Sequence, residues 1–186
     1  IDDSEDYEFL DQFVEIVTEA GCKTFIIHAR KAWLQGLSPK QNREIPPLRY
    51  ELVHRLKRKR PTIEVIINGG IRSLDAISEQ LTIVDGVMVG REAYENPYFL
   101  TSIEQHHWAP ALALTRQEVL EQMLPYIERQ CADGIPLHRI TRHILGLFQG
   151  ENGARSWRRH LSQNAHLPGA GSEILHEAAS KIALKL

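Results

Sequence analysis

The fold is decided by residues 63–70, which read IEVIINGG, together with residues 85–91, which read DGVMVGR. In each stretch a short apolar, largely β-branched run ends in glycine, as is typical of a buried strand followed by a tight turn. A similar run at residues 24–27 precedes them, and segments with helical spacing lie between the three. Strands that alternate with helices predict an α/β protein with a parallel sheet.

Apolar periodicity predicts the helices around these strands. A stripe of Phe9, Leu10, Phe13, Val14, Ile16, Val17 and Ala20 predicts a helix over residues 7–20. The strands are joined by predicted helices at 48–60 and 73–81, and Ser73 can cap the second of these. After residue 97 only helices are predicted, at 116–133, 137–148, 155–164 and 173–185, and Thr115 opens the first with a capping box. We therefore expect an α/β domain over residues 1–100 and an all-helical domain over residues 101–186.

Composition sets broad limits on the function. Hydrophobic residues make up 42% and charged residues 25%, as in an ordinary globular protein. No apolar run is long enough to span a membrane, and the acidic first twenty residues do not resemble a signal peptide. Cys22 and Cys131 lie far apart without a CxxC motif, which favours a reducing cytoplasm. The nine histidines form no HExxH motif or Cys/His pair, so we expect no metal.

Charge is unevenly distributed along the chain. Residues 1–20 hold eight acidic residues and no Lys or Arg; since the whole chain has a net charge of −2, the remainder carries +6. Residues 136–166 contain five arginines (Arg139, Arg142, Arg155, Arg158, Arg159) against Glu151 alone. This clustering of cations favours phosphate binding. A second basic run, at residues 57–60, ends a predicted helix, where cations suit the helix dipole without any ligand.

The two glycine turns are the first candidate site. Each follows a strand and precedes a helical segment, where backbone N–H groups can approach an anion closely. One Gly-Gly turn alone would indicate only a tight loop, but Asn68-Gly69-Gly70 and Gly90-Arg91 follow consecutive strands, and Arg91 can add a bidentate contact. His28 ends the first strand at the same predicted edge; it could be structural, or it could donate to a cofactor phosphate or a substrate carbonyl.

A long connection over residues 29–47 is the second candidate. It holds four cations (Arg30, Lys31, Lys40, Arg43) and Trp33, with no acidic residue before Glu44. Cations position a polyanion and an aromatic ring offers a stacking surface. The alternative is a solvated loop with Trp33 tucked into the core.

Four segments carry a resemblance to a known family: residues 28–47, 67–71, 85–94 and 153–159. These long, ungapped motifs resemble the tRNA-dihydrouridine synthases, most closely their A subfamily, and the similarity runs from residue 1 to about residue 166. The resemblance implies an FMN-dependent (β/α)8 TIM barrel, present here as its C-terminal part, followed by a helical tRNA-binding domain. It implies the reduction of uridine to 5,6-dihydrouridine in the tRNA D-loop, with NADPH as the electron donor.

The resemblance also assigns residues. It implies that FMN is contacted by His28, Asn68, Gly69, Gly70, Gly90 and Arg91. It implies that tRNA is contacted by Lys40, Arg43, Arg155, Arg158 and Arg159.

The chain departs from the family pattern at the catalytic acid. The family's proton donor is a Cys in the first half of the barrel, and a flavin-contacting Lys lies on the strand before this chain begins. Because the sequence opens on Ile1, we expect a piece of a longer protein, inactive alone and with no catalytic residue of its own. Cys22 and Cys131 are predicted to be buried structural thiols.

Two other functions remain open from the sequence. One is a phosphate-binding barrel enzyme acting on a small metabolite; the basic Trp33 loop and basic helical tail argue against it, because such an enzyme needs neither. The other is a non-catalytic RNA-binding remnant. We expect a cytoplasmic monomer with tRNA as its partner.

Overall fold

The computed structural model describes residues 7–31, 36–42, 44–108 and 114–182. The chain divides into two compact units, residues 1–90 and residues 91–186, and each is considered by itself. Among the described residues, no helix has both the length and the apolar character needed to cross a membrane.

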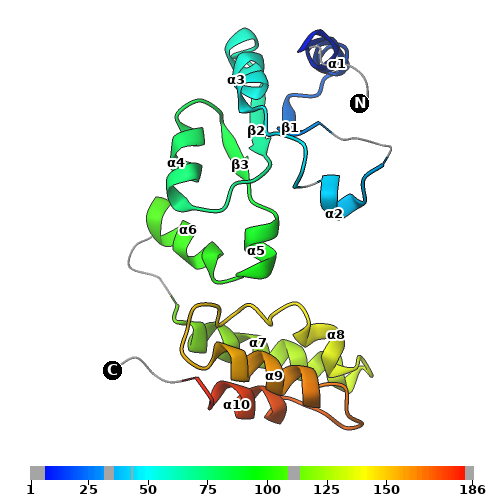
Figure 1. Ribbon diagram of the computed structural model, residues 1–186, viewed down its shortest axis with the longest axis vertical. Coiled ribbons are helices and arrows are strands. Elements are labelled where there is room, and N and C mark those ends of the chain that lie inside the picture. Colours follow the sequence, from blue (N-terminus) through cyan, green and yellow to red (C-terminus); the bar gives the residue numbers. More distant parts are fainter. Residues whose placement is uncertain (1–6, 32–35, 43, 109–113, 183–186) are drawn as a thin grey trace. The chain divides into compact units, whose positions relative to one another are not determined.

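The first unit is built on a three-stranded parallel sheet (Figure 1). Its strands are β1 (Thr24–His28), β2 (Glu64–Asn68) and β3 (Gly86–Met88), in the order β1-β2-β3. Its helices are α1 (Tyr7–Glu19), α2 (Pro39–Asn42), α3 (Tyr50–Lys59) and α4 (Leu74–Leu81). The parallel sheet predicted from the sequence is confirmed, and the Ser73 hydroxyl caps α4 by accepting a hydrogen bond from the Ala76 N–H.

The core of this unit lies around the central strand. Val65 and Ile67 of β2 are fully buried, as is Leu56 of α3, which packs against that strand. β-Branched side chains suit such a pleated surface because their restricted rotamers lose little entropy there. The middle strand therefore organises the α/β unit.

Helix α1 buries a different face from the one predicted. The expected stripe included Phe13 and Ile16, but their side chains are 52% and 58% exposed, and the buried residues are Tyr7, Asp11 and Val14. These three lie at positions i, i+4 and i+7 of one helical face. The reason is electrostatic, because the Asp11 carboxylate is bound by the cationic end of α3.

The cations at the end of α3, Lys57, Lys59 and Arg60, form ion pairs within the first unit. Asp11 accepts hydrogen bonds from Lys59 Nζ at 2.5 Å and Arg60 Nε at 2.8 Å. Lys57 Nζ lies 2.7 Å from the Asp85 carboxylate. The Arg60 hydrogen bond is the main reason that the pKa of Asp11 lies below its ordinary value. The structure thus supports the helix-end interpretation of residues 57–60 rather than a role in ligand binding.

All described elements of the second unit are helices. They are α5 (Arg91–Glu95), α6 (Phe99–His107), α7 (Arg116–Ala132), α8 (Leu137–Thr141), α9 (Ala154–Asn164) and α10 (Glu173–Ala179). Their core surrounds Trp157, whose ring meets that of Phe148 edge-on at 4.8 Å between centroids. The capping box predicted at Thr115 and Glu118 is confirmed.

Two expectations for the helical part were wrong. The helical segment expected after Gly90 is α5, but α6 was not predicted, and the two compact units meet after Gly90. A tight backbone contact explains this: a β-carbon on Gly146 would lie 1.9 Å from the Glu95 carbonyl oxygen. The helix predicted over 137–148 stops at Thr141, and the Leu147 carbonyl accepts a hydrogen bond from the Arg116 side chain.

Asp11→Asn tests the ion pairs that orient α1. We expect the free energy of unfolding to fall by about 1–3 kcal/mol, because two charge-assisted hydrogen bonds are removed. Since folding lowers the pKa of Asp11, its contribution is complete above the unfolded-state pKa near 4 and disappears as pH falls through the folded-state value. Urea denaturation at pH 7 and at decreasing pH measures both effects. Equal stability of variant and wild type at pH 7 would refute this role.

Candidate functional site

The carboxyl ends of the three strands meet at one edge of the sheet. His28, Asn68 and Met88 are level in the strand register. Gly69 and Gly70 follow β2, and Gly90 follows β3 by two residues. A β-carbon on Gly69 would lie 3.6 Å from the His28 ring. Five of the six residues predicted to contact FMN are therefore brought to this edge by strand pairing.

The turn after β2 requires glycine. Gly69 and Gly70 have φ angles of 121° and 70°, in the region that disfavours side chains. A β-carbon on Gly70 would also lie only 2.5 Å from Leu48 Cδ1. The Tyr50 hydroxyl donates a 2.5 Å hydrogen bond to the Gly69 carbonyl oxygen. Leu48 and Tyr50 thus hold the backbone of the turn in one conformation.

The edge presents unpaired backbone donors. Among the described residues, the N–H groups of Gly70 and Gly90 have no backbone hydrogen-bond partner. A β-carbon on Gly90 would meet no atom within 4 Å, so open space adjoins this backbone. The Asn68 side chain donates to the Met88 carbonyl oxygen at 2.8 Å, which ties β2 to β3 below the turns. Exposed N–H donors beside open space suit an anion such as a phosphate.

Arg91, the sixth predicted FMN residue, belongs to the second unit. It is the first residue of α5 and is half-buried. In the chain it directly follows Gly90, so the second glycine turn leads straight into α5.

The basic connection after β1 contains an element that the sequence interpretation missed. Residues 39–42 form the short helix α2, on which Lys40 is exposed. The Gln41 N–H donates to the Ser38 hydroxyl at 3.3 Å, and the Ser38 N–H donates to the Gln41 side-chain oxygen at 2.8 Å. The signal was present as a Ser-x-x-Gln capping box. Arg43 and Trp33, also singled out from the sequence, lie outside the described residues.

Helix α9 of the second unit displays the other predicted RNA contacts. Trp157 and Leu161 bury one face of this helix, while Arg155, Arg158 and Arg159 are exposed. In the part of the chain that the structure describes, none of these three arginines has an acidic partner. Unpaired cations on one helix leave their charge available to an anionic ligand.

The two cysteines are not placed for catalysis. Cys22 precedes β1, at the amino end of the sheet and away from the glycine turns, and Cys131 lies near the end of α7. Both are half-buried rather than fully buried as expected. Burial, and secondarily the Glu173 charge, raises the pKa of the Cys131 thiol and disfavours a reactive thiolate. Within the described residues, no group of three His, Cys, Asp or Glu side chains is arranged to hold a metal ion.

The fold is a parallel α/β unit with glycine turns at the carboxyl edge of its sheet, followed by a helical unit with exposed arginines on α9. The chain belongs to the dihydrouridine synthase family, whose model matches residues 1–183. A tRNA-dihydrouridine(20/20a) synthase of Vibrio vulnificus is 53% identical over 188 residues, covering 100% of this chain and 58% of the relative. Its namesake in Pasteurella multocida is 55% identical over 184 residues, covering 98% and 56%. The chain thus spans little more than half of these relatives' length.

Gly70→Ala tests whether Leu48 fixes the turn. We expect the free energy of unfolding to fall by about 1–3 kcal/mol, because alanine at this φ angle is strained and its methyl group meets Leu48. Combining it with Leu48→Ala should relieve the clash, so a double-mutant cycle should show favourable coupling. Gly90→Ala is the matched control, with open space and no positive φ angle. Equal losses of stability for Gly70→Ala and Gly90→Ala in urea denaturation would contradict this prediction.

Proposed function

We propose that the protein is an FMN-dependent tRNA-dihydrouridine synthase, which reduces uridine to 5,6-dihydrouridine in the tRNA D-loop with NADPH as electron donor. One observation supports this most directly: a chain more than half identical to enzymes of that name carries both unpaired N–H donors at a strand edge and unpaired arginines on a helix. The relatives' names suggest uridines 20 and 20a as the positions modified.

The three-stranded sheet is, in this proposal, part of a (β/α)8 barrel. Barrel enzymes place their active site at the carboxyl ends of the strands and often bind phosphate through the loops after the last strands. The glycine turns after β2 and β3 follow that arrangement. FMN, when bound, supplies the hydride that reduces the uracil ring.

Each residue at the edge has its own task toward FMN. The N–H groups of Gly70 and Gly90 donate to the phosphate, and Gly69 lets the backbone approach it. His28 and Asn68 end their strands at level positions in the register, so both belong to this edge. Arg91 adds a planar, permanently charged donor set that can bind phosphate through two hydrogen bonds.

Recognition of tRNA is assigned to the basic residues. Lys40 and Arg43 contact it from the connection after β1, and Arg155, Arg158 and Arg159 from α9. Such contacts position the RNA without reading its sequence. The target uracil must leave its stack to reach a cofactor held at a strand edge, which costs a few kcal/mol. Binding through many phosphates supplies that free energy.

The proton that completes the reduction is not assigned to this chain. Cys22 lies at the amino end of the sheet, and burial raises the pKa of the Cys131 thiol. The predictions of a cytoplasmic location, a monomeric state and the absence of a metal are retained as parts of the proposal.

Arg91→Ala tests the flavin assignment. The protein expressed from its complete gene should purify yellow, and the variant should retain less FMN because it lacks a charge-assisted hydrogen bond to the phosphate. We expect FMN affinity to fall at least tenfold, and a tenfold loss corresponds to about 1.4 kcal/mol of binding free energy. Arg58→Ala, an exposed arginine on α3, is the control. Flavin absorbance and fluorescence titration measure occupancy, and unchanged occupancy would exclude Arg91 from the phosphate site.

Arg158→Gln tests the RNA assignment. The variant should bind tRNA more weakly, and the slope of log affinity against log salt should flatten by about one unit for each phosphate that is no longer neutralised. Filter binding or fluorescence anisotropy at several salt concentrations gives the slope. Arg129→Gln on α7 removes the same charge from an exposed position in the same unit. Identical slopes for the wild type and Arg158→Gln would remove Arg158 from the RNA interface.

The three candidate functions give different results with the wild-type protein. A dihydrouridine synthase binds FMN and tRNA and forms dihydrouridine, detected in the recovered tRNA. A metabolite enzyme binds a phosphorylated cofactor without tRNA. An RNA-binding remnant binds tRNA without FMN.

A further inference from the structure

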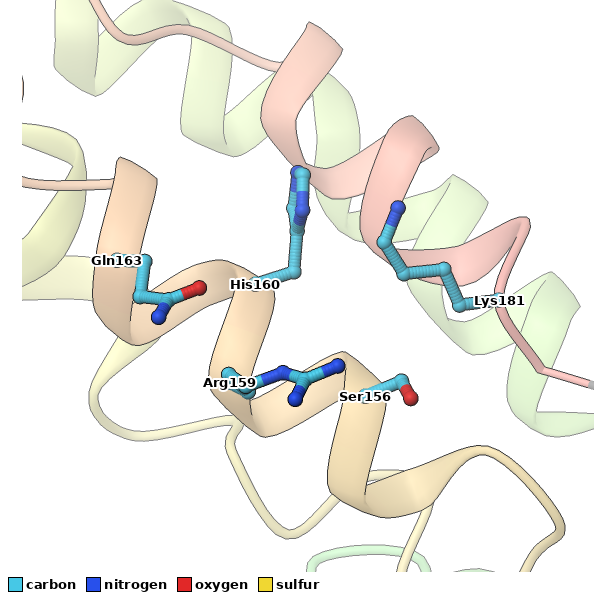
Figure 2. A pocket seen from close by; sticks show the side chains of 5 residues that line it. All are labelled: Ser156, Arg159, His160, Gln163 and Lys181. Atoms are coloured by element: carbon cyan, nitrogen blue, oxygen red, sulfur yellow. The ribbon is translucent and has the colours of Figure 1, made fainter.

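A polar pocket lies between α9 and the end of α10. It has a volume of about 270 Å³ and is lined by Ser156, Arg159, His160, Gln163 and Lys181. The first four project from one face of α9, and Lys181 reaches in from the residues that follow α10 (Figure 2). None of the described residues that line this pocket is Phe, Tyr or Trp, so they offer little stacking surface to a base.

The pocket is electropositive. Among the described residues, its lining contains the cations Arg159 and Lys181 and no acidic residue. Neither Arg159 nor Lys181 has an acidic partner among the described residues. The Glu177 Oε2 lies 3.1 Å from His160 Nε2 without hydrogen-bond geometry. Even when the charge of Glu177 is counted against Arg159 and Lys181, the pocket keeps a positive net charge that attracts an anion.

The backbone fixes where Lys181 enters. Gly153 caps α9 with a φ angle of 93°, and a β-carbon there would lie 2.1 Å from the Lys181 carbonyl oxygen. The segment after α10 therefore lies directly against the start of α9. This close approach brings a cation from the end of the described chain to the arginine face of α9.

The pocket lies on a different face of α9 from Arg158. Ser156, Arg159, His160 and Gln163 follow the i, i+3, i+4, i+7 spacing of a single helical face. Arg158 precedes Arg159 by one residue, which is about 100° around the helix axis. Arg159 thus points its guanidinium along the pocket side of α9, toward Ser156 (Figure 2).

We propose that this pocket binds a backbone phosphate of the tRNA, held jointly by Arg159 and Lys181 with Ser156 and Gln163 as neutral hydrogen-bond donors. The inference rests on the proposed function and assigns to one site a contact that lies on a different face of α9 from Arg158. Phosphate is favoured over a base because the lining is cationic and lacks aromatic residues. The contact orients the RNA without reading its sequence.

The test is a double-mutant cycle on tRNA affinity, with the protein from its complete gene. Arg159→Gln and Lys181→Gln should each weaken binding about threefold to tenfold and flatten the salt slope by up to about one unit. If both cations hold one phosphate, the double variant should lose much less affinity than the product of the single effects. Arg129→Gln, on α7 and outside the pocket, is the matched control. Ser156→Asp, which places a carboxylate in the pocket, should weaken binding at least as much as Arg159→Gln.

The outcomes separate this inference from the proposed function. If the wild type binds tRNA and forms dihydrouridine while both glutamine variants keep its affinity and salt slope, the pocket is not an RNA site. Multiplicative losses of affinity would show that the two cations contact separate groups, which contradicts a shared phosphate. A wild type that neither binds tRNA nor forms dihydrouridine overturns the proposed function itself. Inorganic phosphate is the competitor: at millimolar concentration it should inhibit tRNA binding by the wild type, and Lys181→Gln should reduce that inhibition. Phosphate that binds the pocket without changing tRNA affinity would assign the pocket to a small anion instead.

Discussion

The parallel pairing of β2 with both neighbouring strands is the constraint on which the rest of the α/β unit depends. Burial of Val65 and Ile67 fixes the position of this strand, and the register then brings His28, Asn68 and Met88 level with one another. The connections that follow the three strands therefore begin at the same level of the sheet. Leu48 and Tyr50 close one of those turns from outside the sheet. The arrangement of unpaired N–H donors follows from packing alone, before any ligand is considered.

Ion pairing divides the cations of the chain into two groups. Those at the end of α3 are mostly occupied, because Asp11 and Asp85 bind Lys57, Lys59 and Arg60 within the first unit. Those on the exposed face of α9 have no such partners among the described residues. Both groups look alike as runs of Lys and Arg in the sequence. Only the position of the acidic residues in the fold distinguishes a cluster that is paired within the protein from one whose charge is unpaired.

Features set by local physics were predictable from the sequence, and features set by distant contacts were not. The three strands and the caps at Ser73 and Thr115 were predicted, because their signals lie within a few residues. The buried face of α1 was missed, since Asp11 pairs with residues almost fifty positions away. At the candidate site, the glycine turns were evident in the sequence, whereas the roles of Leu48 and Tyr50 were not, because nothing near them in sequence marks a contact with a later turn.

The close approach of Gly153 to the Lys181 carbonyl has a consequence for how variation among relatives should be interpreted. Any side chain at position 153 would displace the segment that carries Lys181. The two positions should therefore vary together: a relative that lacks the glycine has little reason to retain the lysine. In a mutational scan, substitutions at position 153 should be as damaging as substitutions of the charged residues of the pocket, although Gly153 carries no charge and no side chain. Gly153 matters because its lack of a side chain leaves room for the segment that carries Lys181.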